Sequence, residues 1–197
     1  LLVRGGETVV DAAGEGFTSS RVAGSGARSA IGVNARGEIL LVATSGTFSQ
    51  LGAVMKALPL LGSPFFVLYG DSYLTCDYRA VARRFESVPG AEGLMTAFRN
   101  EGRWGASNLR CEGGKIVKYD KADRDPAMRH IDYGLNVLTR EAFTGFADVA
   151  EFDLSAVFQR LLACGRLAAC EVPERFYEIG SHEGLADLAA YLRGRRG

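Results

Sequence analysis

The fold class of this chain is decided by the stretch Phe65-Phe66-Val67-Leu68-Tyr69-Gly70-Asp71-Ser72-Tyr73-Leu74. Its aromatic and β-branched content is typical of a strand that is buried on both faces. Gly70 and Asp71 follow the apolar run, so a carboxylate stands at the carboxyl end of the strand, where open α/β sheets bind ligands. Gly70 permits close approach of the backbone to a charged ligand. Asp71 is therefore the first candidate functional residue; the alternative is that it only caps the following turn and helix.

Helical and strand patterns alternate on both sides of this stretch. Before it, the apolar residues from Leu51 to Leu58 follow helical spacing up to Pro59. After it, we expect a helix over 78–85, a strand over 93–99, a hairpin over 108–119, a strand over 134–139, a helical segment over 140–146, a helix over 153–164, a strand over 167–172 and a helix over 183–192. This order predicts an α/β fold with a mostly parallel, mixed sheet.

The first part of the chain differs in composition from the rest. Residues 1–48 are rich in Gly, Ala, Ser and Thr, and two β-prone runs, 29–34 and 38–43, are joined by Ala35-Arg36-Gly37. A glycine at the end of such a connection favours a β-hairpin. We therefore divide the chain into an N-terminal β segment, 1–48, and an α/β domain, 49–197.

Composition excludes several functional classes. Lysine and arginine number 23, as do aspartate and glutamate, so no net charge favours nucleic acid or a membrane surface. No stretch approaches the roughly 20 apolar residues of a membrane span, and the first residues lack the pattern of a signal peptide, so we expect a cytoplasmic protein. The four cysteines and two histidines have no metal-ligand spacing and indicate neither a zinc site nor a disulfide framework.

An ordered set of short motifs spans residues 51 to 192. The motifs are Gly52-Ala53-Val54 followed by Ala57-Leu58-Pro59, the stretch 65–74, Lys118-Tyr119-Asp120-Lys121, Asp132-Tyr133-Gly134 and Tyr177-Glu178-Ile179-Gly180-Ser181. Together they resemble the sugar-1-phosphate nucleotidyltransferase family. The resemblance implies a doubly wound sheet of the nucleotide-diphospho-sugar transferase type. It also implies transfer of a nucleoside monophosphate from a nucleoside triphosphate to a sugar 1-phosphate, with release of pyrophosphate.

The same resemblance assigns a metal site. Two acids of the family hold Mg²⁺, which prefers oxygen ligands and often takes one or two carboxylates. The matching residues are Asp71 and Glu178, although Glu178 replaces the more usual aspartate and is longer by one methylene. The alternative is that Glu178 is a surface acid beside a Gly-Ser turn.

The resemblance also assigns substrate-binding residues. Lys121 matches a lysine that holds the sugar phosphate, for which a compact ammonium is suited, and Asp120 is its neighbouring acid. The alternative is that both belong to a solvated charged loop. Asp132 and Gly134 fall where the family presents groups to the sugar. Gly52 matches a glycine that approaches the nucleotide base, although the preceding Ser49-Gln50-Leu51 departs from the family's usual sequence.

One part of the family pattern is missing from this sequence. The family's triphosphate loop is glycine-rich and basic and connects a strand to a helix. The nearest stretch here, Gly24 to Ser29, has no apolar strand before it and no clear helix after it. We therefore expect the α/β domain to lack its first βα unit, which would leave a central strand without a partner unless the N-terminal hairpin fills the gap.

Residues 3–48 instead resemble part of a phosphodiester glycosidase domain. The likeness is carried by Gly5-Gly6 to Phe17, by Arg28 to Val33 and by Gly37 to Val42, but that family's later Asp-Gly-Gly-Gly motif is missing. The sequence thus reads as a junction of two partial domains.

Three functional hypotheses follow. The first is a nucleotidyltransferase that uses Mg²⁺, a nucleoside triphosphate and a sugar 1-phosphate, with activity impaired by the missing loop. The second is a non-catalytic module that binds a sugar phosphate or a nucleotide. The third is a phosphodiester glycosidase remnant in which acids such as Glu15 line a pocket. The sequence leaves homo-oligomerisation, the nucleotide base and the sugar open.

Overall fold

The structure is a computed structural model that describes residues 62–121, 123, 125–146, 153–179 and 181–195. It also describes the backbone of four earlier strands, β1 (Leu2–Arg4), β2 (Glu7–Val9), β3 (Arg28–Val33) and β4 (Ile39–Thr44). Several features expected from the sequence lie outside the described residues. They are the helix over Leu51 to Leu58 with Gly52, the glycine-rich stretch from Gly24 to Ala27, the connection Ala35-Arg36-Gly37, Glu15 and Gly180.

Strands and helices alternate from residue 65 onward, as the sequence predicts. The elements are β5 (Phe65–Leu68), β6 (Ser72–Tyr73), α3 (Tyr78–Glu86), β7 (Gly93–Arg99), β8 (Leu109–Glu112), β9 (Lys115–Tyr119), β10 (His130–Leu138), the 3-10 helix η1 (Glu141–Phe143), α4 (Leu154–Ala163), β11 (Leu167–Val172), β12 (Tyr177–Glu178) and α5 (His182–Gly194).

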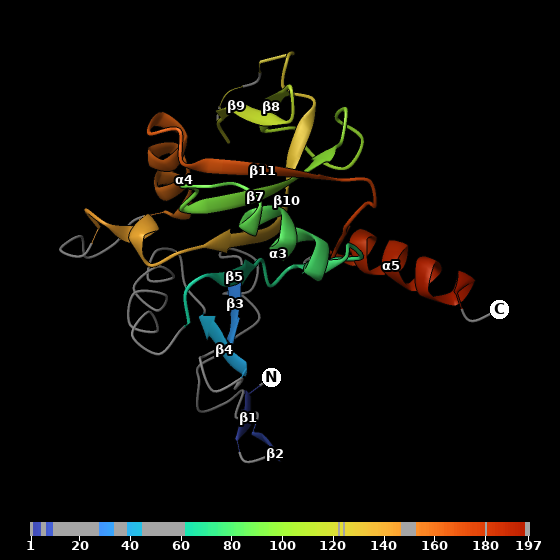
Figure 1. The fold of residues 1–197 in the computed structure, drawn as a ribbon. Coiled ribbons are helices and arrows are strands. Elements are labelled where there is room, and N and C mark those ends of the chain that lie inside the picture. The colour runs from blue at the N-terminus through green and yellow to red at the C-terminus, as the bar shows by residue number, and fades with distance from the viewer. Residues whose placement is uncertain are drawn as a thin grey trace.

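One mixed sheet organises the molecule, with the strand order β11-β7-β10-β5-β3-β4 (Figure 1). β11 pairs with β7 in parallel, and β10 runs antiparallel between β7 and β5, so β5, β7 and β11 point the same way. β8 branches from β10 and forms the predicted hairpin with β9. The expected α/β class is therefore confirmed.

The predicted N-terminal hairpin is present as β3 and β4, which pair antiparallel along their whole length. β3 also pairs with β5 at Ser29 and Leu68. The hairpin therefore occupies the side of β5 that would otherwise expose unpaired backbone groups.

The core has two parts because β7 and β10 are covered on both faces. Met95 of β7 packs in one cluster with Val157, Phe158 and Leu161 of α4. Leu94, the preceding residue of β7, packs in the other cluster with residues of α3. Successive side chains of a strand point to opposite faces, so this alternation places α3 and α4 on the two faces of a doubly wound sheet.

Each long helix begins at a side-chain cap. Asp77 accepts a hydrogen bond from Arg79 N in α3, Asp153 caps α4 through Ser155 N, and Ser181 caps α5 through Gly184 N. Asp77 and not Asp71 caps α3, so the alternative assignment of Asp71 as the helix cap is wrong.

Two element boundaries differ from the sequence expectation. The strand expected from Gly134 begins earlier, at His130, because the polar residues ahead of Gly134 continue the ladder with β7. The helical segment expected over 140–146 is only the 3-10 helix η1; Gly145 lies at φ 91°, a left-handed conformation that cannot continue a helix.

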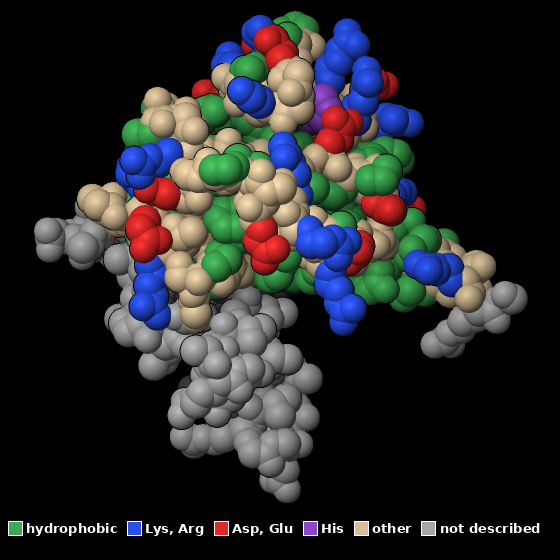
Figure 2. All heavy atoms as spheres, in the orientation of Figure 1, with side chains coloured by type: hydrophobic (Ala, Val, Ile, Leu, Met, Phe, Trp, Pro, Cys, Tyr) green, Lys and Arg blue, Asp and Glu red, His purple; other side chains and the backbone are tan. Residues whose placement is uncertain are grey.

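The surface is mixed in charge. Figure 2 shows acidic and basic side chains interspersed over the face turned to the viewer, in keeping with the equal numbers of the two charges. None of the helices within the described residues is long and apolar enough to cross a membrane.

Candidate functional site

The turn after β5 brings Asp71 beside Glu178. β5 stops at Leu68, and after the turn β6 pairs with β12 instead of the main sheet, with Ser72 opposite Glu178. The N–H of Ile179 donates to the carbonyl oxygen of Asp71 at 2.7 Å. Asp71 and Glu178 are far apart in the sequence but lie on neighbouring backbone segments, which are joined by this backbone contact.

The Asp71 carboxylate is only lightly engaged. Its Oδ1 accepts a long hydrogen bond of 3.4 Å from Ser72 Oγ, and its Oδ2 forms none within the described part of the chain. A half-buried carboxylate with an unused oxygen suits Mg²⁺, which takes oxygen ligands and commonly completes its shell with substrate phosphates and water. The described residues contain no group of three or more His, Cys, Asp or Glu side chains that could hold a metal ion by themselves. Asp71 and Glu178 are therefore the two carboxylates that the metal prediction depends on.

Glu178 is tied to the beginning of α5. Ser181 Oγ donates to Glu178 Oε2 at 2.6 Å and also accepts from Gly184 N at 3.0 Å. Gly184 lies so close to β12 that a Cβ atom there would overlap the carbonyl oxygen of Glu178. The first turn of α5 therefore fixes the position of Glu178, which is more constrained than a surface acid beside a turn.

Asp132 is buried and holds β10 against the β5–β6 turn. Its Oδ2 accepts a hydrogen bond of 2.5 Å from Tyr69 Oη, and its Oδ1 accepts from Gly134 N at 3.1 Å. Tyr69 N in turn donates to the carbonyl oxygen of Gly134 at 3.0 Å. The register between β10 and β7 shifts between Asp132 and Asn136, which marks a bulge at this point.

Gly134 adopts φ 92°, a conformation that favours glycine. A Cβ atom at this position would lie 3.1 Å from Tyr69 Cδ2 and 3.6 Å from Ser72 Oγ. The bulge therefore approaches the turn that carries Asp71 closely, and the predicted residues Gly134 and Asp71 belong to the same small region.

Burial raises the pKa of the Asp132 carboxyl above its ordinary value. The hydrogen bonds from Tyr69 and Gly134 act against burial and lower this pKa, and so does the positive charge of Lys121. Nearby Asn136 also lowers it, although the fully buried Asn136 amide makes no hydrogen bond of normal geometry with the described residues. The effect of burial exceeds these opposing effects, so the pKa of Asp132 lies above its ordinary value.

Asn108 connects the Asp120 loop to Asp132. Its Oδ1 accepts from Asp132 N at 2.9 Å, and its carbonyl oxygen accepts from Asp120 N at 3.0 Å. The Asp120 side chain accepts from Asp123 N at 3.1 Å and so shapes its own loop. Asp120 therefore acts within the described structure as a loop-forming residue at the border of the site.

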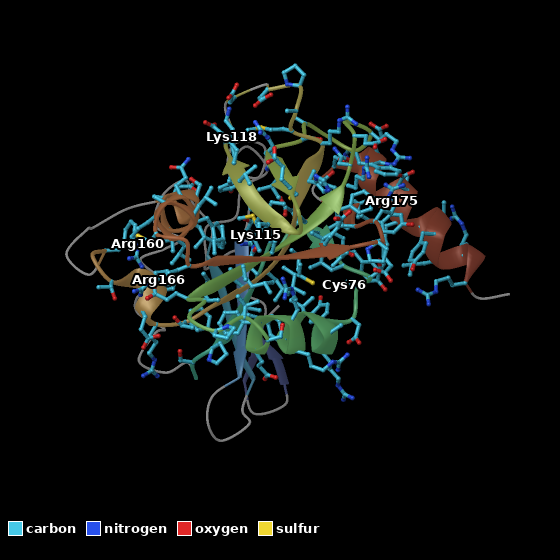
Figure 3. The ribbon with its side chains drawn as sticks, turned by 45° about the horizontal axis from the view of Figure 1, so that its top comes forward. Cys76, Lys115, Lys118, Arg160, Arg166 and Arg175 are labelled. Atoms are coloured by element: carbon cyan, nitrogen blue, oxygen red, sulfur yellow. The ribbon has the colours of Figure 1, made fainter. Side chains whose placement is uncertain are left out.

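Lys121 follows Asp120 directly in this loop. Its Nζ lies 3.9 Å from Oδ1 of Asp153, the cap of α4, and its charge reaches Asp132. Its neighbour Lys118 instead pairs with Asp123, and at 3.4 Å with Asp125. In Figure 3 Lys115 and Lys118 lie on the β8–β9 hairpin, away from Arg160 and Arg166 beside α4. The loop is charged and partly solvated, and the positive charge of Lys121 lowers the pKa of the buried Asp132.

A second set of contacts holds the segment that carries Glu178. The guanidinium of Arg175, labelled in Figure 3 near α5, stacks 4.5 Å above the ring of Trp104 and 4.4 Å from that of Tyr177. The Nη2 atom of Arg175 also pairs with Asp187 of α5 at 2.8 Å. One side chain therefore joins the loop after β7, β12 and α5.

The structure brings together most of the residues predicted from the sequence. Asp71, Glu178, Asp132 and Gly134 surround the β5–β6 turn, with exposed Gly70 in that turn, while Asp120 and Lys121 lie at its border. Sequence reasoning missed Tyr69, Asn108 and Ser72. The only signal for Tyr69 was its place at the end of the strand, and Asn108 carried no motif.

Structural comparison assigns the fold. A protein from Bacillus anthracis assigned as a glucose-1-phosphate thymidylyltransferase, in complex with sucrose, matches with a TM-score of 0.62 and 16% identity over 72% of this chain and 60% of that one. The inositol-1-phosphate CTP transferase from T. maritima matches with a TM-score of 0.54 and 17% identity over 68% of this chain and 56% of that one. The fold is that of the sugar-phosphate nucleotidyltransferases.

HddC from Yersinia pseudotuberculosis matches as well, with a TM-score of 0.55 and 19% identity over 72% of this chain and 61% of that one. A structure of HddC complexed with GMP-PN matches with a TM-score of 0.53. This chain therefore spans between 56% and 61% of the length of these solved structures. No family model and no curated protein matches the sequence.

Proposed function

We propose that this chain carries a sugar-1-phosphate nucleotidyltransferase site, which transfers a nucleoside monophosphate from a nucleoside triphosphate to a sugar 1-phosphate and releases pyrophosphate. The observation that supports the proposal is the pairing of β6 with β12, which joins the backbone segments that carry Asp71 and Glu178. The fold shared with sugar-phosphate nucleotidyltransferases supports it.

Asp71 and Glu178 would hold Mg²⁺, which stabilises the negative charge that develops on the leaving pyrophosphate. Asp71 offers an oxygen without a hydrogen-bond partner among the described residues, and the first turn of α5 fixes Glu178. The protein contributes two oxygen ligands, and substrate phosphates would supply others.

Lys121 would hold the phosphate of the sugar 1-phosphate, with Asp120 shaping the loop that presents it. The exposed backbone of Gly70 and the bulge at Gly134 would let substrate approach the turn closely. Asp132 would act mainly by holding this bulge, because both of its oxygens already accept internal hydrogen bonds. The partners in this proposal are two small molecules, the nucleoside triphosphate and the sugar 1-phosphate. Assembly into a homo-oligomer is also part of the proposal.

Titration calorimetry with nucleoside triphosphates and sugar 1-phosphates, with and without Mg²⁺, tests the proposal when pyrophosphate release is followed in the same samples. We expect Mg²⁺-dependent binding and release, both abolished by Asp71→Ala. Asp123→Ala is the matched control, since Asp123 lies in the Lys118 loop and pairs with Lys118.

Equal losses in the two variants would refute the metal assignment. Mg²⁺-dependent binding without pyrophosphate release would instead identify a non-catalytic sugar-phosphate or nucleotide-binding module on the same fold. The residues before β5 show no likeness to the family's triphosphate loop, which is the observation that favours this second function.

A further inference from the structure

A small polar cavity lies on the side of the sheet that carries the β8–β9 hairpin. Its volume is about 260 Å³, and its charged or ionisable lining residues are Arg99, Cys111, Arg129, His130 and Glu171. None of these residues belongs to the site proposed above. We call this the His130 cavity, and its lining comes from β7, β8, the segment before β10, β10 itself and β11.

Positive groups outnumber negative ones in the His130 cavity. Arg99 and Arg129 carry fixed charges and His130 can become charged, whereas Glu171 is the single carboxylate of the lining. Glu171 Oε1 faces His130 Nε2 at 3.6 Å. Cys111 adds no negative charge, because burial raises the pKa of its thiol to about 11.

Arg129 is the unused cation of the cavity. Arg99 is engaged by Glu101 at 3.0 Å, but the exposed Arg129 guanidinium makes no hydrogen bond or ion pair within the described part of the chain. The His130 side chain is only 12% exposed, and its Nδ1 likewise has no partner among the described residues. Because Nδ1 is itself buried, the ring nitrogen that faces the cavity carboxylate is Nε2.

Size and chemistry together select the ligand. The volume of the His130 cavity is below the roughly 300 Å³ at which pockets for drug-sized ligands begin, so the ligand must be small. The planar guanidinium of Arg129 can donate two hydrogen bonds to a tetrahedral oxyanion such as phosphate. A neighbouring cavity that shares Arg129 is larger, about 440 Å³, but its lining sets two carboxylates, Glu101 and Asp125, against that one arginine and does not suit an anion. We propose that the His130 cavity binds a phosphate group, free or carried by a small phosphomonoester, at a second site outside the proposed catalytic residues.

The chain allows a direct test by NMR because it contains only two histidines, His130 and His182. Inorganic phosphate, and in a second arm glycerol 3-phosphate, is titrated into the protein without Mg²⁺ in a phosphate-free buffer. We expect the imidazole Cε1–H resonance of His130 to move saturably. The resonance of His182, which lies on α5 outside the cavity, should stay in place. Tighter binding of one ligand identifies whether free phosphate or a phosphomonoester is preferred.

Three variants distinguish phosphate binding in the His130 cavity from nonspecific attraction of phosphate by surface charge. Arg129→Gln should weaken phosphate binding about tenfold, as expected for loss of one charge-assisted contact. Arg110→Gln removes the same charge from the nearby β8–β9 hairpin, where Arg110 pairs with Glu112, and should leave the affinity nearly unchanged. Glu171→Gln should tighten binding, because it removes the only carboxylate of the cavity.

The proposal is overturned if the His130 resonance does not move saturably with either ligand, or if Arg129→Gln and Arg110→Gln weaken binding equally. Both arginines are at least partly exposed, so the folded state of each variant is expected to persist and is checked by circular dichroism. The result is independent of pyrophosphate release, so failure here leaves the proposed transferase function untouched.

Discussion

Tyr69 donates a 2.5 Å hydrogen bond from its hydroxyl to Oδ2 of Asp132, and this bond joins the turn after β5 to the bulge in β10. The backbone bond from Tyr69 N to the Gly134 carbonyl reinforces the connection. Because Asp71 follows Tyr69 by two residues, the position of the proposed metal ligand depends on this contact between neighbouring strands.

Replacement of Tyr69 by phenylalanine tests the contact. Tyr69→Phe leaves the buried Asp132 without its main side-chain donor, so we expect the free energy of unfolding to fall by about 1–3 kcal/mol. Urea denaturation followed by circular dichroism measures the change. Tyr78→Phe is the control, since Tyr78 is partly exposed on α3 and its hydroxyl makes no hydrogen bond with the described residues. Similar losses in both variants would show that the Tyr69–Asp132 hydrogen bond does not itself stabilise the fold.

The raised pKa of Asp132 should make the stability of the protein depend on pH. Its pKa is higher in the folded protein than in the unfolded chain because burial disfavours the charged form. The folded state therefore holds the proton of Asp132 more tightly, which adds to the free energy of unfolding. This added stability is complete below the pKa of Asp132 in the unfolded chain and is lost as the pH rises through its pKa in the folded protein.

Asp132→Asn removes that dependence. Relative to the original protein, the variant should gain in free energy of unfolding as the pH rises from about 4 to 7, measured by urea denaturation at several pH values. A difference between the two proteins that stays constant over this range would contradict the shifted pKa.

Gly134→Ala tests the close approach between the bulge and the turn. Alanine at φ 92° is strained, and its Cβ would press on the Tyr69 ring, so we expect a loss of about 1–3 kcal/mol or more in unfolding free energy. Gly145→Ala is a matched control, because Gly145 has nearly the same φ, 91°, but nothing within 4 Å of its Cβ position. The loss of unfolding free energy at Gly134 beyond that at Gly145 measures the contact with the Tyr69 ring. Equal losses at the two positions would mean that backbone strain alone accounts for the effect.

Gly184→Ala should displace Glu178. The added methyl group overlaps the Glu178 carbonyl oxygen, so β12 and the first turn of α5 must separate. We expect lower thermal stability and weaker Mg²⁺-dependent nucleotide binding in calorimetry. Gly194→Ala at the other end of α5 meets open space and should be neutral or slightly stabilising. If Mg²⁺-dependent binding survives Gly184→Ala unchanged, Glu178 is not a metal ligand.

Lys121→Met should mainly raise the KM for the sugar 1-phosphate, because the proposed role of Lys121 is to hold its phosphate. Lys118→Met removes a neighbouring charge that is already paired with Asp123 and Asp125, and should change the KM little. Steady-state kinetics with pyrophosphate release as the readout compares the two, and equal increases in KM would assign the effect to the net charge of the loop.

The sequence predicted the elements that depend on local patterns. The period of apolar residues located α3, α4 and α5, and the glycines at Gly113 and Gly114 predicted the β8–β9 hairpin. It could not predict that β10 would run antiparallel between β5 and β7, because strand order depends on contacts between distant residues. The sequence predicted that the strand stops at Gly70 and Asp71, but for the same reason it could not predict that Ser72 would pair with β12.

In the candidate site, too, local motifs were found from the sequence and contacts between distant residues were not. Asp71 and Glu178 were found through motifs, and the structure brings their backbones together; their role in metal binding stays a prediction. Asn108 and Tyr69 were missed because their importance comes from partners in other strands, which no local pattern records. The likeness of residues 3–48 to phosphodiester glycosidase domains, and the division of the chain near residue 48, also stay predictions.

The stacking of Arg175 on Trp104 has an optical consequence. Trp104 is the single tryptophan of the chain, and Arg175, which lies on it, also holds Tyr177 and Asp187. The tryptophan fluorescence of the protein, excited selectively over its tyrosines, therefore comes from a residue whose surroundings change when α5 and the Glu178 segment move. The emission spectrum should report the detachment of that segment separately from the loss of helical signal, without any added label.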